Sequence, residues 1–279
     1  MFKYFGQSVG TAGTTPATSA VLLAAQQKLN EMATPMDGAR YATVNPAANA
    51  ALVEGMKGLF NPTGTIGSQF KSGMMGKGVL GYDEINMSQS IQQFTTGSRT
   101  AGATVTTTVS TQGQTTLALT TNGATDTIKL GDVFTVANVY AVNPQTRQST
   151  GSLYQFVALA DATASGSAVT VTVPAMYTAG NALANIDAFP QASAAVTWMG
   201  GASTAYPQNL VYYKDAFTMA TVDLFLPQGV HAASRVNDNG ISLRLIQDYD
   251  GTNDQLISRL DVLYGWAVLR PEMACRVWG

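Results

Sequence analysis

Charged residues are scarce in this 279-residue chain, where they make up 11% of the sequence against roughly 25% in an average soluble protein. Glutamate is absent between Glu84 and Glu272. Thr, Ser, Ala, Gly, Asn and Gln fill the gap. A free monomer needs surface charge to stay soluble, so we expect a surface that is largely covered by copies of the same protein.

Residues that commonly bind metals or perform catalysis are also few. Cys275 is the only cysteine and His231 the only histidine, which excludes an intrachain disulfide, a cysteine zinc site and a histidine metal site. Cys275 has apolar neighbours, so we expect a small core residue. The net charge is −2 and no basic run exceeds two residues, so the electrostatic pattern of a specific nucleic-acid-binding protein is missing. We expect no cofactor.

Long apolar runs are missing as well. No run of eighteen apolar residues occurs, and the first ten residues, MFKYFGQSVG, lack the apolar core of a signal peptide. We therefore expect no membrane segment and a soluble protein made in the cytoplasm. Hydrophobic residues still make up 46% of the chain, enough to fill one large domain or two ordinary ones.

Two helices are predicted in the first part of the chain, each opened by a proline. For the first, Thr15 is the candidate cap and Pro16 takes the first helical position. Its apolar face is Leu22, Ala25, Leu29 and Met32.

The second predicted helix is capped by Asn45, opened by Pro46 and ended by Pro62. Its apolar residues are Leu52, Val53, Met56, Leu59 and Phe60. Strands are expected at ARYATVN and over residues 79–88. Helices and strands together predict an α+β or α/β fold for this part of the chain.

The middle of the chain changes to a segment rich in Thr, Ser, Ala, Val and Gly. Asn122 and Gly123 stand between two strand-like runs and predict a hairpin. Valines alternate with a period of two in SAVTVTV. We predict an inserted β domain at residues 99–205, with 1–98 and 206–279 forming one α+β domain around it.

The closing stretch, from Asp254 to Gly279, is apolar with a few charges set into it, among them Arg259, Asp261 and Arg276. Apolar residues fall on both faces, as in a strand buried on two sides. Arg270 should lie at the strand end, beside Pro271. One face is predicted to carry Leu260, Val262, Tyr264, Trp266 and Val268, and the other Leu263, Ala267 and Leu269.

One sequence match concerns nucleophilic catalysis. Gly6-Gln-Ser8-Val-Gly10 has the spacing of a nucleophile elbow, but that motif needs a strand before it and a helix after it. TAGTTP follows instead. A triad would also need His231, which we place in a loop. We therefore predict that Ser8 and His231 have no catalytic role and that the protein is not an enzyme.

Two further matches have simpler interpretations. Gly76-Lys-Gly78-Val-Leu-Gly81 matches a dinucleotide fingerprint, but it runs into a strand-like segment rather than a helix, so we interpret it as a flexible glycine loop. The acidic stretch at residues 248–254 offers oxygens to calcium, but lacks the spacing and the glutamate of an EF-hand. A hairpin turn is the first interpretation, and calcium binding stays an alternative.

Several stretches resemble the major capsid (coat) proteins of tailed double-stranded DNA phages: RLDVLYGWAVLRPEMACRV, VNPAANAALVEGMKGLFNP, LGYDEINMSQ and DYDGTNDQLISRLDVLYGWA. The stretch IKLGDVFTVANVYAVNP resembles a strand pair of the inserted domain in the coat protein group of the short-tailed Salmonella phages. The resemblance covers nearly the whole chain. It implies the Hong Kong ninety-seven type capsid fold, with axial and peripheral domains and a small β-barrel-like inserted domain outside the shell.

The resemblance also implies a function. Such proteins assemble as hexamers and pentamers on a scaffolding protein, and the icosahedral shell takes in DNA through a portal. We therefore expect a structural, self-assembling protein of the virion that is made in the host bacterial cytoplasm and contacts DNA only non-specifically.

Family members carry an N-terminal arm, an extended loop and a spine helix before the region that matches residue 1. We expect these to be missing here, which would leave one apolar face of the closing strand uncovered. The candidate structural and assembly residues are Tyr264, Trp266, Arg270, Asn122 and Gly123.

Two other classes of protein are alternatives. A β-rich surface or secreted binding module, adhesin-like, explains the Thr/Ser/Gly-rich centre equally well, but explains the capped helices and the closing strand less well. A hydrolase that uses Ser8 ranks third.

Overall fold

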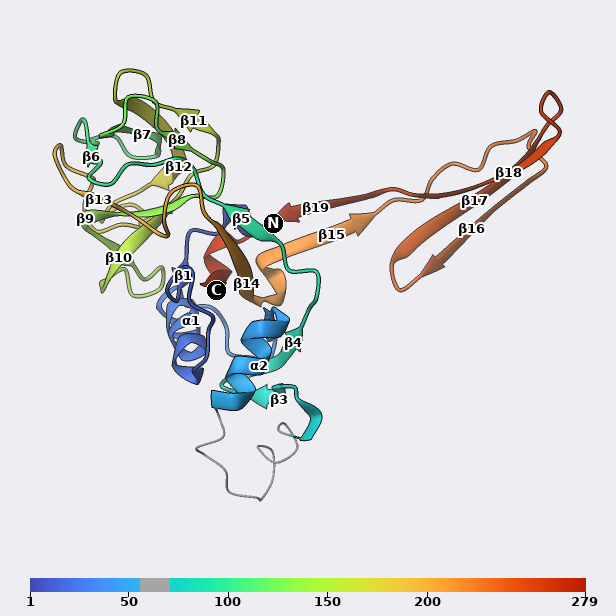
Figure 1. Ribbon diagram of the computed structural model, residues 1–279, viewed down its shortest axis with the longest axis horizontal. Helices are drawn as coiled ribbons and strands as arrows, with labels where there is room; N and C mark the ends of the chain where they lie inside the picture. Colours follow the sequence, from blue (N-terminus) through green and yellow to red (C-terminus); the bar gives the residue numbers. More distant parts are fainter. Residues whose placement is uncertain (56–70) are drawn as a thin grey trace. The chain divides into compact units, whose positions relative to one another are not determined.

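The computed structural model describes residues 1–55 and 71–279 (Figure 1). This part of the chain is mostly β, and two α-helices lie wholly within it. The chain forms two compact units. The first unit is Met1–Ala216 with Arg270–Gly279, and the second unit is Phe217–Leu269.

A seven-stranded mixed sheet is the centre of the first unit. Five of its pairings run along the order β1-β20-β14-β2-β4-β3; β1 and β20 are parallel, as are β2 and β4, and the others are antiparallel. The strands are β1 (Ser8–Val9), β20 (Ala274–Trp278), β14 (Ala205–Tyr213), β2 (Arg40–Val44), β4 (Tyr82–Met87) and β3 (Gly76–Val79), and β5 (Gln93–Thr95) pairs with the start of β14.

Strand β20 accounts for the apolar end of the chain, because all five of its residues are buried. Cys275 and Val277 join the apolar cluster beneath the helices. Trp278 packs against Tyr206, with ring centroids 5.6 Å apart, and belongs to a second cluster with Phe94. The expectation of a strand buried on two sides is confirmed for this segment, and Cys275 is a core residue as predicted.

Helix α1 (Ser19–Glu31) buries Leu22, Ala25 and Leu29, as the apolar spacing predicted. Its predicted start is wrong: Thr15 and Pro16 precede the helix, and Pro16 is buried. The residue before the helix is Thr18, whose backbone is extended. Tertiary packing of Pro16 therefore takes precedence over its preference for a first helical turn.

Helix α2 (Pro46–Gly55) begins where it was predicted to begin. Asn45 caps it, since its Oδ1 accepts a hydrogen bond of 2.9 Å from the backbone N–H of Ala48. Leu52 and Val53 are buried against the sheet. The later part of the predicted stripe and its end at Pro62 lie outside the described residues.

The expected strand over residues 79–88 is a hairpin of β3 and β4. Leu80 and Gly81 form its turn with φ of 54° and 78°, the conformation that two-residue hairpins favour. The interpretation of Gly76–Gly81 as a flexible glycine loop is therefore wrong, because β4 pairs with this segment and orders it.

The strands between residues 104 and 198, here called the β module, form separate sheets around their own core. The cluster of buried apolar residues draws only on residues 103–196. Val169, Val171 and Val173 are buried, so the period of two is confirmed. The sheets are β12 (Ala168–Met176), β7 (Gln114–Thr120) and β6 (Thr104–Val105); β10 (Ser149–Val157), β9 (Val133–Val142) and β13 (Val196–Trp198); and β11 (Ala162–Thr163) with β8 (Thr127–Ile128).

Asn122 and Gly123 do not form a hairpin, because β7 pairs with β12 and β6, whereas β8 pairs with β11. Instead the Asn122 side chain donates a hydrogen bond of 2.6 Å to the carbonyl of Ala101. A Cβ at Gly123 would lie 2.0 Å from the carboxylate of Asp126. The pair is a packed loop that needs glycine for close approach.

The second unit contains only strands and loops among its residues. A ribbon of β15 (Phe217–Thr221) and β19 (Tyr264–Val268) accompanies a three-stranded antiparallel sheet of β16 (Ala232–Asp238), β17 (Ile241–Asp250) and β18 (Gln255–Val262) (Figure 1). The acidic stretch is the β17–β18 turn, as predicted. The carboxylate of Asp250 accepts hydrogen bonds from Thr252 and Asn253 there.

The closing stretch is thus three strands rather than one. Strands β18 and β19 are exposed: Tyr264 is 56% and Trp266 65% accessible. The expectation of one long strand buried on two sides is wrong for these residues, whereas the expectation of an uncovered apolar face agrees with their exposure in the described chain. Arg270 follows the end of β19 and precedes the 3-10 turn Pro271–Met273, as expected.

The first prediction concerns the β module. Residues 99–205 expressed alone should give dispersed amide shifts by NMR, because the module has its own core. Phe134→Ala in that segment should lower its free energy of unfolding by about 3–5 kcal/mol, since Phe134 is fully buried and stacks on Phe156 at 5.5 Å. Leu183→Ala, at a residue 66% exposed, is the control. Coil-like shifts in the unsubstituted segment would contradict the boundary.

Candidate functional site

Ser8 and His231, the residues that a catalytic triad would need, belong to different units. Ser8 is 2% exposed in β1 of the first unit, and no helix follows that strand directly. His231 is exposed and belongs to the second unit. The Ser8 hydroxyl has no hydrogen-bond partner among the described residues, so no base is placed to activate it.

Metal and membrane sites are equally unsupported within the described ranges. No group of three or more His, Cys, Asp or Glu side chains is gathered there to hold a metal ion. None of the helices described is both long and apolar enough to span a bilayer. The Asp248–Asp254 turn forms hydrogen bonds within itself, one of them 2.6 Å from the Tyr249 hydroxyl to Asp254.

Buried polar groups instead gather where the β module meets the seven-stranded sheet. Arg99 and Asp132 form an ion pair whose side chains are 2% and 0% exposed. Asp132 also accepts hydrogen bonds from the backbone N–H groups of Gly97 (3.1 Å) and Lys129 (2.8 Å). Burial lowers the pKa of Arg99, and the nearby Asp132 carboxylate opposes that shift. In such a buried pair each partner offsets the cost of burying the other.

Arg276 brings a second cation to the same place from β20. Its side chain is fully buried, donates to the carbonyl of Gly131 at 2.9 Å and stacks over Trp278 at 5.6 Å. Burial lowers the pKa of Arg276 to about 10, against the opposing effect of Asp132. Two guanidinium groups thus share the field of one carboxylate, and β20 is joined to the turn that precedes β9.

Gln155 of β10 completes the open edge of the sheet. Its Oε1 accepts a hydrogen bond of 2.7 Å from the Ser8 N–H, and its Nε2 donates one of 2.9 Å to the Ser8 carbonyl. One side-chain amide therefore replaces a neighbouring strand for β1. Close by, Asn143 donates to the Glu31 carbonyl at the end of α1, at 2.8 Å.

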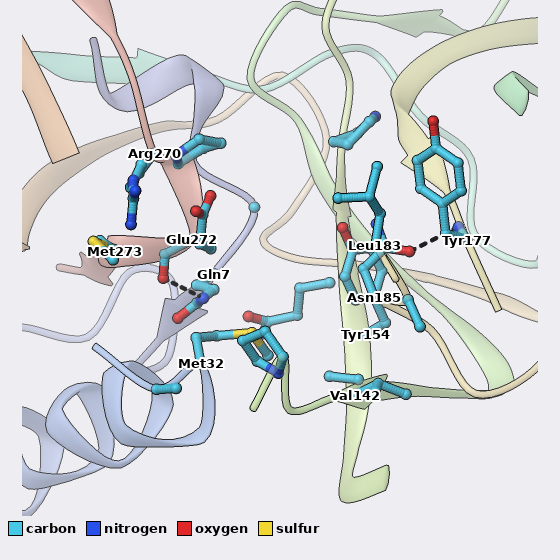
Figure 2. A pocket seen from close by; sticks show the side chains of 18 of the residues that line it. Gln7, Met32, Val142, Tyr154, Tyr177, Leu183, Asn185, Arg270, Glu272 and Met273 are labelled. Atoms are coloured by element: carbon cyan, nitrogen blue, oxygen red, sulfur yellow. Dashed lines mark hydrogen bonds between the residues drawn. The ribbon is translucent and has the colours of Figure 1, made fainter. Parts of the chain in front are cut away.

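A cavity of about 560 Å³ lies within the first unit, between the β module and the end of α1 (Figure 2). Its lining is mainly apolar and includes Met32, Val142 and Leu183. Burial raises the pKa of Tyr154 to about 12, so its hydroxyl stays neutral. The side-chain amide of Gln7 donates a hydrogen bond of 2.8 Å from its Nε2 to the backbone carbonyl of Glu272. The lining residues show no pairing of a nucleophile with a base.

The residues of this junction were missed by reasoning from sequence. Arg99 and Asp132 are 33 positions apart, and Arg276 and Gly131 are 145 apart, so no local spacing connects them. Arg276 was noticeable only as a charge inside an apolar stretch. Among the predicted assembly residues, Asn122 and Gly123 serve a loop of the β module, whereas Tyr264 and Trp266 lie in the second unit.

Side-chain hydrogen bonds and a buried ion pair that join strands are the main features of this junction. The chain belongs to the P22 coat protein family: the family described as "P22 coat protein - gene protein 5" matches residues 5–277. It is thus a phage coat protein, as the resemblance implied, and not an enzyme.

Solved structures match the chain, one of them over 37% of its length. The CUS-3 coat protein I-domain is 27% identical over 37% of this chain and 98% of its own length, with a TM-score of 0.29. No curated protein matches the chain.

A prediction follows for the buried ion pair. Asp132→Ala should lower the free energy of unfolding by about 3–5 kcal/mol, because it leaves the Arg99 charge buried without compensation. The double change Arg99→Met with Asp132→Leu should cost less. Glu84→Ala is the control, since its pair with Lys77 is 4.0 Å long and partly exposed. Urea unfolding measures all three, and an Asp132→Ala cost no larger than the control's would refute the role of the pair.

A further prediction compares the contribution of the Ser8 side chain to stability with that of its backbone hydrogen bonds. Ser8→Ala and His231→Ala should leave the unfolding midpoint close to that of the parent chain, because neither side chain has a supported role. Gln155→Ala should cost about 1–3 kcal/mol, since it leaves the Ser8 N–H and carbonyl unpaired. Thermal unfolding provides the comparison. A hydrolytic activity lost in either alanine variant would be the contrary result.

Proposed function

We propose that this chain is the major capsid subunit of its phage and that it self-assembles, through hexamers and pentamers, into the icosahedral shell that encloses the DNA. Family membership supports a structural coat protein. The observation that carries self-assembly is an exposed apolar sheet face in the second unit. Contiguous apolar patches larger than a few hundred Å² are unusual on monomers and mark interaction surfaces.

That apolar face follows from the strand registers. Leu243 of β17 lies between Val236 of β16 and Val262 of β18, and Leu245 lies opposite Leu260. Because paired residues point to the same side of a sheet, they form one face, on which the polar pair of Gln247 and Ser258 separates them from Tyr249 and Leu256. Its exposed members are Val236, Ile241, Leu243, Leu245, Tyr249, Leu256, Leu260 and Val262.

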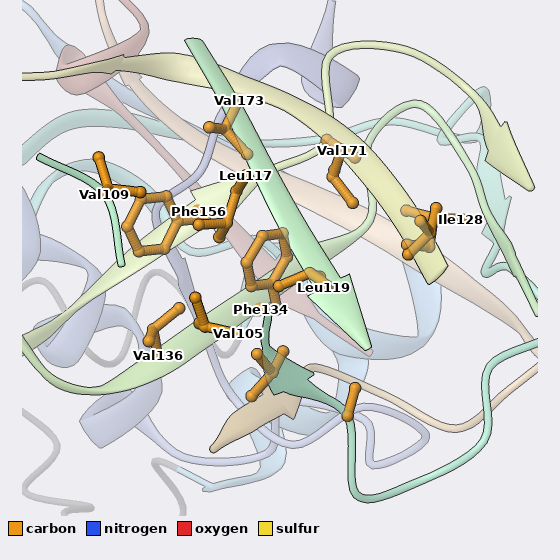
Figure 3. Packing of buried hydrophobic residues seen from close by; sticks show 14 of the residues in the cluster. Val105, Val109, Leu117, Leu119, Ile128, Phe134, Val136, Phe156, Val171 and Val173 are labelled. Carbon is orange, nitrogen blue, oxygen red and sulfur yellow. The ribbon is translucent and has the colours of Figure 1, made fainter. Parts of the chain in front are cut away.

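The same proposal assigns the parts of the Hong Kong ninety-seven type fold. The seven-stranded sheet with α1 and α2 would be the axial domain, the second unit would belong to the peripheral domain, and residues 99–205 would be the inserted domain. Separate apolar cores support this division: one draws on residues 103–196 (Figure 3) and the other on residues outside that range. A spine helix or a neighbouring subunit would cover the apolar face.

The remaining partners come from the family resemblance. We expect a scaffolding protein and a portal protein to take part in assembly, and DNA to be contacted non-specifically, since the chain has 15 basic and 17 acidic residues. The protein would be made in the host bacterial cytoplasm and reside in the virion. The adhesin-like alternative is not favoured by the coat protein family.

Assembly gives a prediction for Trp266. Because Trp266 is 65% exposed, Trp266→Ala should change the stability of the isolated chain little, in contrast to the loss expected for a packed tryptophan. It should reduce the yield of shells, because assembly would bury the ring. Leu183→Ala, at 66% exposure in the β module, should leave the yield unchanged. Negative-stain electron microscopy and sedimentation measure the yield, and a parent chain that forms no particles with its scaffolding protein would refute the proposal.

A further inference from the structure

Strand β18 has an open edge. It is the outer strand of the three-stranded sheet, and in the described part of the chain its only strand partner is β17. Seven of its eight residues are exposed. It contains neither proline nor lysine, the residues that commonly block sheet edges. Its outward N–H and C=O groups are therefore available to another strand.

The charges of β18 are self-complementary. Arg259 and Asp261 are two positions apart and so lie on the same face, opposite to the apolar one. Arg244 of β17 donates to Asp261 Oδ2 from its Nε, at 3.2 Å, and Arg259 Nε donates to Oδ1, at 2.6 Å. The Arg259 side chain is 68% exposed, and its guanidinium has further donors for a second carboxylate.

One register of two antiparallel β18 strands uses both charges. If Leu260 lies opposite Leu260 of a second copy, Arg259 of each strand lies opposite Asp261 of the other. Centring the pair on Ser258 would place Arg259 opposite Ile257, and centring it on Arg259 would place two guanidinium groups together. Opposite charges directly across strands stabilise pairing and like charges destabilise it, so the Leu260 register is favoured.

We propose that β18 pairs antiparallel with β18 of a second copy of this chain, centred on Leu260. The pairing joins two three-stranded sheets into one, with their apolar faces on the same side. The edge of β16 lacks this property, because the residue two positions after Arg235 is Asn237 rather than an acid. The pairing names one subunit contact of the proposed shell, and only its place in a shell rests on the proposed function.

Cysteine cross-linking tests the register in the full chain. Residue 260 would face its own symmetry mate with Cβ atoms about 4.5–5.5 Å apart, near the separation that a disulfide spans. The two copies of residue 256 would stand roughly 27 Å apart. Leu256 and Leu260 are both exposed, at 58% and 67%, and Cys275 is fully buried. Leu260→Cys should therefore give a covalent dimer on mild oxidation, and Leu256→Cys should not.

A charge-reversal variant tests whether Arg259 of one copy pairs with Asp261 of the other. Adding Arg259→Glu to Leu260→Cys places like charges across the strands at two points and should lower the dimer yield about ten-fold or more, the effect of roughly 1.4 kcal/mol. Arg147→Glu, the same change at an exposed arginine of the β module, should leave the yield unaltered. Far-UV circular dichroism checks that each variant is folded.

The outcomes are distinct. Equal cross-linking at residues 256 and 260 would overturn the register and show unregistered stacking of apolar faces. Shells that form from Leu260→Cys without the cross-link would overturn the pairing and leave the proposed function intact. A specific cross-link in a chain that forms no shells would support the pairing and refute the proposed function.

Discussion

The first unit depends on strand β20, because this strand connects the two ends of the sequence. It pairs in parallel with β1 and antiparallel with β14, so residues from the start, the later part and the end of the chain meet in one sheet. Such long-range pairing first requires large loops to close, which costs conformational entropy before the strand contacts can form. The sheet is therefore incomplete until the last residues of the chain are in place.

The buried charges lie where the β module meets the sheet that contains β20. In a chain with few charged residues, Arg99, Asp132 and Arg276 are nonetheless all buried. Burying ions is costly unless they are paired and hydrogen-bonded. Here the guanidinium groups donate to backbone carbonyls of Met199, at 3.1 Å, and Gly131, which orients the β module relative to β20. Apolar packing is less directional and would set this orientation less sharply.

The second unit has the opposite character. Its sheet has an apolar face and a face that carries charged residues such as Arg244 and Asp261, but the apolar residues remain largely accessible. Large exposed apolar patches usually mark a surface that contacts a partner. In the proposed shell, neighbouring subunits would cover this apolar face.

Features that depend on neighbouring residues could be predicted from the amino-acid sequence. The stripe of α1, the Asn45 cap, the alternating valines of β12, the β17–β18 turn and the burial of Cys275 were all predictable, because side-chain period and capping act within a few residues. The resemblance of several stretches to phage coat proteins was also visible. Long-range packing makes Asn122-Gly123 a packed loop, places Pro16 before its helix, and leaves Trp266 exposed whereas Trp278 is buried. It also decided that Asp132 serves Arg99, and that Gln155 closes the edge of β1. A local pattern defines which side of a strand is apolar, but its partner is chosen by residues a hundred or more positions away.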